Sequence, residues 1–310
     1  MSSDVSSFAM KLEGIHHITG ITGDAPRNVE FYAGVLGLRL VKKSVNQDDP
    51  TVYHLFYADE KGSAGSDITF FEYPDVPKGR AGAGMVYRVV WRVASEEALG
   101  FWKARLSAKR VESDKAPGSL TFEDPEGLEL QLVVDEGDDA PLMADHPEVP
   151  ADFALRGFDG VRTFASDPSM SANLLGETLG FSGTSDSAWM SRGDTRGSFY
   201  VYDEPPTKPG LSGGGTIHHV AWACQMDEHE SWRARVAEVA GVTPVIDRYY
   251  FKSIYFREPS GVLFEIATLG PGFAVDEPQE SLGEKLALPP DYEHLREKLE
   301  GVLTPLPNPR

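Results

Sequence analysis

Residues 213–222 read GGGTIHHVAW, and residues 82–91 read GAGMVYRVVW. Both stretches run from a glycine-rich turn into a β-branched, apolar segment that ends at tryptophan, a pattern typical of a strand entering a sheet. A second matched pair follows: FEDPEGLELQLV at 122–133 and FREPSGVLFEIA at 256–267 each contain a strand end, a Pro-x-Gly turn and a closing strand. The chain therefore repeats itself, and the repeat predicts its architecture.

A second register of the repeat joins the other parts of the chain. GIHHITGI at 14–21 lines up with GFDGVRTF at 157–164, and NVEFYAGVLGLRL at 28–40 lines up with MSANLLGETLGFSG at 170–183. The latter pair predicts an amphipathic helix that ends at a Leu-Gly step, where glycine suits a left-handed C-terminal cap.

These matches predict four modules of one strand, one helix and two or three further strands. The helices of the second and fourth modules are expected at EEALGFWKARLS and EHESWRARVAEV. The modules are residues 12–76, 82–135, 155–205 and 213–270.

The segment DEGDDAPLMADHPEVPAD at 135–152 is rich in acid and proline, which is typical of a linker between two halves. We therefore expect an N-terminal domain at 1–145 and a C-terminal domain at 146–270. Residues 271–310 are expected to form a packing arm with a last helix at PDYEHLREKLEGVL, 290–303.

Composition narrows the class of protein. With 41% apolar and 10% aromatic residues the chain can bury a core. No apolar run approaches the roughly 20 residues of a membrane span, and MSSDVSSFAMKLEG lacks the regions of a signal peptide, so a cytoplasmic protein is expected. A net charge of -19 argues against nucleic acid and membrane partners. Cys224 is the single cysteine, so a metal site would use nitrogen and oxygen ligands.

Histidines are placed unevenly in the repeat. Four of the eight form two doublets, 16–17 and 218–219, each at the start of an apolar run. The aligned positions in the other modules are Tyr-Arg at 87–88 and Asp-Gly at 159–160. Residues that serve the fold should recur in every copy, whereas these doublets do not, so they are candidates for chemistry.

The closing strand of the fourth module carries one acid among apolar neighbours. Glu265 in LFEIA aligns with Gln131 in LELQL, and an ionised carboxylate in such surroundings is costly unless it is paired or metal-bound. Two imidazoles and one carboxylate make the facial set that binds Fe(II) or a similar ion with open positions. Because strand side chains alternate, each doublet supplies one ligand unless the strand bulges, and periodicity does not say which.

At these residues the sequence resembles the vicinal oxygen chelate superfamily. The resemblance implies an α+β fold in which four βαβββ modules pair into two cupped, barrel-like mixed sheets with a C-terminal tail helix. Residues 14–59, 247–268 and 270–290 look like the hydroquinone-type ring-cleaving dioxygenases of that superfamily.

The resemblance also implies an activity and a ligand set. The expected enzyme is a non-heme dioxygenase that uses Fe(II), with Mn(II) as the alternative, to insert O2 into a dihydroxylated aromatic, and a homo-oligomer is compatible with it. The second member of each doublet is implied as a ligand, which gives His17, His219 and Glu265.

Further roles are implied for His16, Thr19, His218, Arg248 and Tyr255. An imidazole with a pKa near neutrality can take the proton of a phenol, which makes His16 or His218 the expected general base. Arg248 can hold a phenolate by charge-assisted hydrogen bonds, and Tyr255 can donate a proton to a developing oxygen anion. Alternatively, Arg248 pairs with Asp247 or Glu258, and Tyr255 is a strand aromatic.

Two other functions remain open. Glu72 in ITFFEY closes the first module, and glyoxalase-type relatives use an acid from each module, so a glyoxalase-like lyase or isomerase with Glu72 as an additional ligand is the alternative. A non-catalytic protein that sequesters an aromatic compound is the other. Of the remaining histidines, His54 is expected to line or support the pocket. His146, His229 and His294 are expected in solvent.

Overall fold

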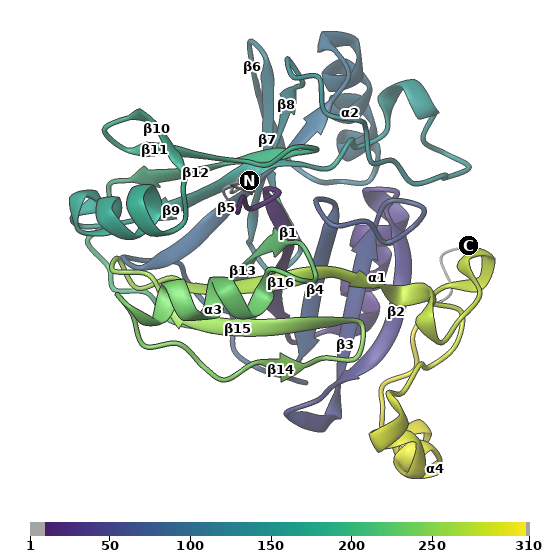
Figure 1. The fold of residues 1–310 in the computed structure, drawn as a ribbon. Coiled ribbons are helices and arrows are strands. Elements are labelled where there is room, and N and C mark those ends of the chain that lie inside the picture. The colour runs from purple at the N-terminus through teal and green to yellow at the C-terminus, as the bar shows by residue number, and fades with distance from the viewer. Residues whose placement is uncertain (1–9, 308–310) are drawn as a thin grey trace, which may run out of the picture.

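The structure, a computed structural model, describes residues 10–307. Two eight-stranded mixed sheets hold the four repeats, and a C-terminal tail extends beside the first of them (Figure 1). The first sheet has the order β14-β15-β16-β13-β1-β4-β3-β2, and the second has the order β10-β11-β12-β9-β5-β8-β7-β6. This is the predicted α+β arrangement of paired modules.

The bounds of these elements follow the repeat. The first sheet contains β1 (Ile15–Thr22), β2 (Arg39–Asn46), β3 (Asp49–Ala58), β4 (Asp67–Glu72), β13 (Thr216–Cys224), β14 (Ile246–Asp247), β15 (Phe251–Arg257) and β16 (Leu263–Pro271). The second contains β5 (Met85–Val93), β6 (Ser113–Ala116), β7 (Ser119–Glu123), β8 (Glu129–Val134), β9 (Phe158–Phe164), β10 (Ser182–Ser185), β11 (Ala188–Arg192) and β12 (Gly197–Asp203). The α-helices are α1 (Ala25–Val29), α2 (Glu96–Ala108), α3 (His229–Ala237) and α4 (Arg296–Glu300).

The sheets do not follow the predicted halves of the chain. The first sheet combines the first and fourth modules, and the second combines the second and third. The predicted division at 145/146 would instead join the first module to the second and the third to the fourth. Antiparallel ladders between β1 and β13 and between β5 and β9 produce the observed pairing, because they join segments from opposite halves. The boundaries 1–145 and 146–270 stay a prediction about folding units only.

The β1–β13 ladder is symmetric about its centre. Ile18 lies opposite Val220, and His17 lies opposite Ala221 on one side of this central pair. On the other side of the central pair, the corresponding residue pair has its histidine on β13 and its partner on β1. The ladder therefore has a local two-fold axis, and residues at equivalent positions of the two modules approach each other across it.

Each strand of this ladder also carries a β-bulge. The pairing skips one residue on each strand, and the skipped residues are His16 and His218. In the second sheet the pairing skips Tyr87 and Asp159, which are the aligned positions. The bulge is therefore a property of the repeat, and in the first sheet each histidine doublet lies at a bulge.

The helices confirm the predicted Leu-Gly ends. The helix after β1 continues beyond α1 as a π-helix, Glu30–Val35, and the third module has a π-helix at Leu174–Thr178. Gly37 and Gly180 follow them, each with φ +72°, a conformation that glycine adopts without steric cost. The predicted last helix is also present, although its first half, Pro290–Leu295, is a 3-10 helix before α4 begins.

Buried acids at the two Pro-x-Gly turns connect the two sheets. The carboxylate of Glu258 accepts hydrogen bonds from three hydroxyl groups of the third module: Ser171, Tyr200 and Tyr202. At the equivalent turn, Asp124 of the second module accepts a hydrogen bond from Tyr32 of the first, 3.0 Å away. Each turn thus ties a module of one sheet to a module of the other, which resists separation of the sheets.

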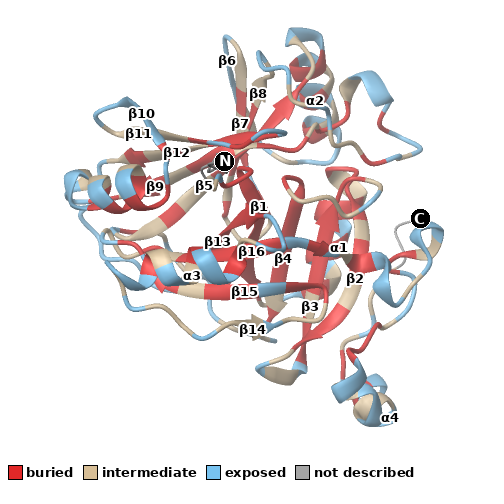
Figure 2. Cartoon of the chain, in the orientation of Figure 1, coloured by how far each residue is buried: buried red, intermediate tan, exposed pale blue. Residues whose placement is uncertain are grey.

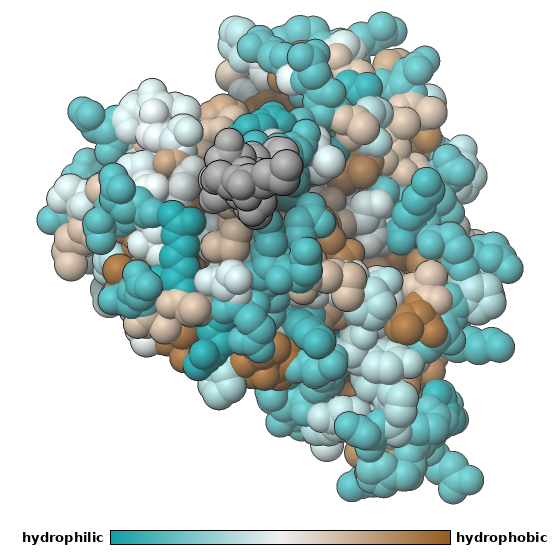
Figure 3. Space-filling view, viewed as in Figure 1, coloured by the Kyte–Doolittle hydropathy of each residue, from teal (hydrophilic) through white to brown (hydrophobic). Residues whose placement is uncertain are grey.

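The main core is one continuous cluster with residues from both sheets and from the helices (Figure 2). Its largest fully buried side chains include Trp91, Trp102, Trp222 and Trp232. Hydrophilic side chains dominate the face seen in Figure 3, with only small hydrophobic areas between them. Within the described residues, no helix is both long and apolar enough to cross a membrane.

The C-terminal tail runs along the free edge of β2. The fully buried Lys42 forms ion pairs with Asp276, at 2.8 Å, and with Glu277. Further along, Lys43 and Leu286 form a parallel β-bridge. Because an uncovered edge strand invites pairing with other chains, the tail protects this edge of the sheet.

We expect Glu258→Ala to lower the free energy of unfolding by about 2–4 kcal/mol, because buried tyrosine hydroxyls lose their acceptor. Urea unfolding followed by circular dichroism measures this loss. The matched control is Glu136→Ala at an exposed site, which should change stability by less than about 0.5 kcal/mol. Equal losses in the two variants would contradict the proposed role of the turn.

Candidate metal centre and pocket

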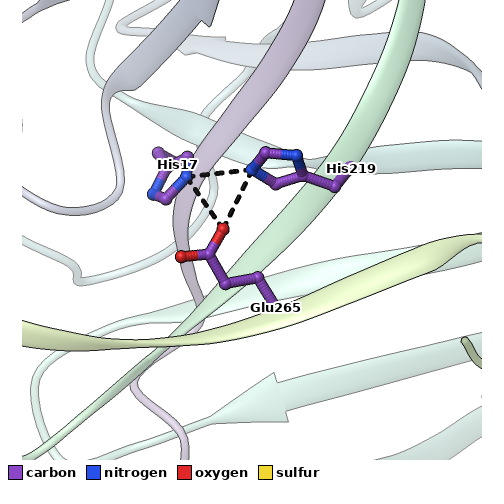
Figure 4. Close-up of side chains that lie close together, drawn as sticks. All are labelled: His17, His219 and Glu265. Atoms are coloured by element: carbon purple, nitrogen blue, oxygen red, sulfur yellow. Dashed lines mark hydrogen bonds and ion pairs between the residues drawn. The ribbon is translucent and has the colours of Figure 1, made fainter. Parts of the chain in front are cut away.

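Three buried side chains from three neighbouring strands converge at one point of the first sheet (Figure 4). His17 Nε2 lies 3.3 Å from His219 Nε2 and 3.3 Å from Glu265 Oε2. His219 Nε2 lies 2.9 Å from the same oxygen. The three residues predicted from the sequence are therefore brought together.

The strand register explains this convergence. Ala221 on β13 lies opposite His17 on β1 and beside Glu265 on the parallel strand β16. His219 is two residues before Ala221 and so points to the same face of the sheet. The three donor groups surround a residue whose side chain is a single methyl group, which leaves room for them to approach one another.

The electrostatics of this cluster suit a cation. Burial alone would raise the pKa of Glu265, but the adjacent imidazoles of His17 and His219 hold it well below its ordinary value. Burial lowers the pKa of His219. Neither oxygen of Glu265 receives a hydrogen bond of good geometry, although Oε2 is within ion-pairing distance of both rings. An ionised carboxylate and neutral imidazoles are the forms in which these groups bind divalent metals.

One backbone carbonyl determines which ring nitrogens of His16 and His17 carry a proton. His16 Nε2 lies 3.1 Å from the carbonyl oxygen of Thr268, which can only accept, so this nitrogen carries the proton. Burial lowers the pKa of His16 to about 3, so the ring is neutral and its Nδ1 has a lone pair. That Nδ1 is 2.9 Å from Nδ1 of His17, which must then donate. A metal ion binds the neutral form of a histidine, and with the proton on Nδ1 the free nitrogen of His17 is Nε2, which faces the cluster.

The other bulged histidine behaves differently. His218 Nδ1 contacts His219 Nδ1 at 2.7 Å, as in the first doublet, but His218 is exposed. Neither His16 nor His218 borders the cavity beside the cluster. Both contact a cluster histidine from behind, and their predicted role as general base stays a prediction.

A cavity of about 40 Å³ lies beside the cluster. His54 is part of its wall and packs against two phenylalanines in tilted arrangements, with ring centroids 3.9 Å from Phe56 and 4.4 Å from Phe71. The aromatic residues of the wall are Phe56, Phe71, Tyr250, Phe251 and Tyr255. A wall that combines aromatic faces with polar groups is typical of a site for a flat organic ligand.

His54 is held by a chain of hydroxyl groups. Its Nε2 lies 2.9 Å from Thr69 Oγ1, which in turn lies 2.8 Å from Thr19 Oγ1. Burial lowers the pKa of His54 well below its ordinary value, so the ring is neutral. The predicted site residue Thr19 therefore supports the pocket wall through Thr69 and lies outside the metal-binding group.

Arg248 and Tyr255 lie together in the cavity wall. Arg248 Nε is 3.4 Å from the hydroxyl of Tyr255, and its guanidinium lies 5.5 Å from the centre of that ring. The Tyr255 ring is 5.7 Å from the ring of His219. The acid that pairs with Arg248 is Asp48, so neither Asp247 nor Glu258, the partners considered from the sequence, takes this role.

Glu72 lies away from the cluster. Its Oε1 accepts a hydrogen bond from the backbone nitrogen of Ala25, at the start of α1. The position in the first module that corresponds to Glu265 is Thr69, because Thr19 pairs with Thr69 as Ala221 pairs with Glu265. Glu72, the additional ligand of the alternative function, is therefore not part of the described cluster.

One peripheral histidine was also predicted wrongly. His229 is buried, and its Nε2 lies 3.0 Å from the carbonyl of Ile266, so it fastens the first turn of α3 to β16. His294 is exposed as expected. The pocket residues Gln47, Asp48 and Phe71 carry no sequence signal, because they reach the site only through the pairing of β2, β3 and β4.

Comparison with known proteins shows which family the chain belongs to. A protein-family model described as the Glyoxalase/Bleomycin resistance protein/Dioxygenase superfamily matches residues 14–132. A relative from Bacillus subtilis (strain 168), named "Putative ring-cleaving dioxygenase MhqO", is 42% identical over 96% of this chain and 97% of its own. The "Chlorohydroquinone/hydroquinone 1,2-dioxygenase" of Sphingobium indicum is 31% identical over 93% of this chain and 95% of its own.

The similarity extends to a solved structure. A crystal structure of a "putative dioxygenase" from Bacillus subtilis subsp. subtilis str. 168 has a TM-score of 0.88 and 41% identity, and the match covers 96% of this chain and 99% of that one. The chain therefore belongs to the glyoxalase and dioxygenase superfamily and, within it, to the ring-cleaving dioxygenases, a family of oxidoreductase enzymes.

Proposed function

We propose that this protein is an Fe(II)-dependent dioxygenase that opens the ring of a hydroquinone-type aromatic. The observation that carries the proposal is the buried group of two imidazoles and one carboxylate at the end of an aromatic-walled cavity. A relative named as a hydroquinone dioxygenase, similar along nearly the whole chain, supports the substrate class. Mn(II) is the alternative metal, since the same ligand types bind it.

His17, His219 and Glu265 would hold the ion. When bound, it would supply Lewis acidity and a redox centre for the reaction of the aromatic diol with O2. The wholly buried donor set matches the ligand types of non-heme iron oxygenases. His16 would orient His17 through the Nδ1 contact, since its other nitrogen is fixed on a backbone carbonyl.

Residues of the cavity wall would bind the substrate and stabilise the charge that develops on it. Phe56 and Phe71 present apolar ring surface to the aromatic ring, which excludes water from it. Burial raises the pKa of Tyr255, so its phenol keeps its proton and can donate a hydrogen bond to a developing oxygen anion. Arg248 supplies a positive charge for a phenolate oxygen. His54 is a neutral imidazole in the wall and would accept a phenolic proton from the substrate.

Oxygen uptake with the ferrous-loaded protein tests the reaction. The substrates are hydroquinones, catechols and the adduct of methylglyoxal with glutathione. We expect O2 consumption with loss of ring absorbance for the hydroquinones, because the wall and the ligand set suit a flat diol. Thioester formation without O2 uptake would overturn the proposal in favour of a glyoxalase-like reaction.

Substitution of a ligand should remove the metal without unfolding the chain. We expect His219→Ala and Glu265→Gln to weaken iron binding by more than about a hundredfold and to abolish turnover. Glu265→Gln is nearly isosteric and copies the residue at the equivalent position of the second module, Gln131. Metal analysis after anaerobic reconstitution, with circular dichroism, makes the measurement. His294→Ala is the control, and full iron content in Glu265→Gln would contradict the ligand set.

A proton-transfer role for His54 predicts a different result. We expect His54→Gln to lower kcat by about 10²–10⁴-fold, the usual contribution of a general base, while the iron content stays that of the wild type. Steady-state kinetics and metal analysis on the same samples separate the two effects. Unchanged kcat would assign proton transfer to another group.

A further inference from the structure

Two segments far apart in the chain meet at the mouth of the cavity. Asp48, in the turn between β2 and β3, accepts hydrogen bonds from Arg248 on both carboxylate oxygens, at 3.2 and 3.0 Å. Beside it, Gln47 Nε2 donates to the backbone oxygen of Arg248 at 2.8 Å. Gln47, Asp48 and Arg248 all line the cavity, and we call their contact the rim clamp.

The cavity is too small for an aromatic ring while the rim clamp is closed. Its volume is about 40 Å³, whereas an apolar cavity that binds benzene measures about 150 Å³. Part of the wall must therefore move before a substituted benzene can reach the metal-binding group. The central strands β1, β13 and β16 are buried in the middle of the sheet, so the movable part is at the edge.

The rim clamp is a weak part of the wall. The side chain of Asp48 is 73% exposed, and an exposed ion pair contributes little to stability. On the other side of the contact, β14 has only two residues and forms the edge of the sheet. The turn itself is anchored from behind, because Tyr292 of the tail donates to the backbone oxygen of Gln47 at 2.8 Å.

The inner side of the rim clamp faces the cavity beside the metal-binding group. The side chain of Arg248 is only 16% exposed, and its Nε is directed to the hydroxyl of Tyr255. A guanidinium has five N–H donors; Asp48 takes two and Tyr255 takes one, which leaves two for a ligand. Without Asp48, the side chain of Arg248 would be free to rotate toward solvent, because its remaining hydrogen bond, to the hydroxyl of Tyr255, is long.

We propose that Asp48 is a positioning residue that holds Arg248 over the cavity, and that the rim clamp opens to admit the aromatic diol and closes behind it. The inference rests on the proposed function for the identity of the ligand. The contact itself can be tested without turnover.

Hydrogen exchange on the metal-free full-length protein tests the clamp, with Asp48→Asn compared with Asp49→Asn at the neighbouring residue, the first of β3. Asp49 accepts only from Thr51 among the described contacts and has no bond to Arg248, so the charge change is matched. We expect amide exchange around Arg248 to rise by about two- to fivefold in Asp48→Asn alone. Higher salt should raise exchange in the wild type but not in Asp48→Asn, because it screens the ion pair.

Kinetics on the iron-loaded protein test the positioning. We expect kcat for hydroquinone to fall by about tenfold in Asp48→Asn, because a misplaced Arg248 stabilises charge poorly, while KM stays equal or falls because the mouth opens more easily. Exchange equal to that of Asp49→Asn would overturn the clamp, and an unchanged kcat with faster exchange would overturn the positioning role. If the wild type consumes no O2 with any hydroquinone, the proposed function fails, while the exchange result still decides whether Asp48 holds Arg248.

Discussion

The antiparallel ladder between β1 and β13 is the constraint from which the site follows. Its two-fold symmetry places equivalent positions of the first and fourth modules next to each other, and its bulges direct both histidine doublets toward the cluster. Parallel pairing of β13 with β16 then adds Glu265 beside Ala221. Three strands in one register thus supply every donor atom, so the geometry depends on backbone hydrogen bonds and not on a flexible loop.

The second sheet has the same backbone and no such site. Its positions equivalent to His17, His219 and Glu265 are Gly160, Arg88 and Gln131. A Cβ at Gly160 would lie 2.2 Å from the backbone oxygen of Phe199, so a histidine side chain does not fit there without displacing a strand. Arg88 is paired with Glu129. The repeat therefore supplies a scaffold, and the side chains decide which copy carries chemistry.

The tail is part of the architecture of the pocket. It covers β2, the strand that leads into the turn at the mouth of the cavity, and Tyr292 fastens that turn. Lys42, buried beneath the tail, is neutralised by tail acids and lies 4.8 Å from the ring of Tyr250, a residue of the cavity wall. A charge without water needs such partners, so docking of the tail and formation of the wall depend on each other.

The amino-acid pattern alone was sufficient for the repeat, the strands, the Leu-Gly helix ends and the candidacy of the two histidine doublets and Glu265, because alternation, turn residues and ligand types are local properties. The choice of His17 and His219 within the doublets came from the resemblance to the superfamily. The pattern did not determine the sheet partners, since pairing joins segments that are distant in sequence. The convergence of His17 and His219 requires the first and fourth modules to share a sheet. Burial of His229, the distance of Glu72 from the cluster and the meeting of Asp48 with Arg248 likewise depend on register. Those contacts exist only once the strands have been placed side by side.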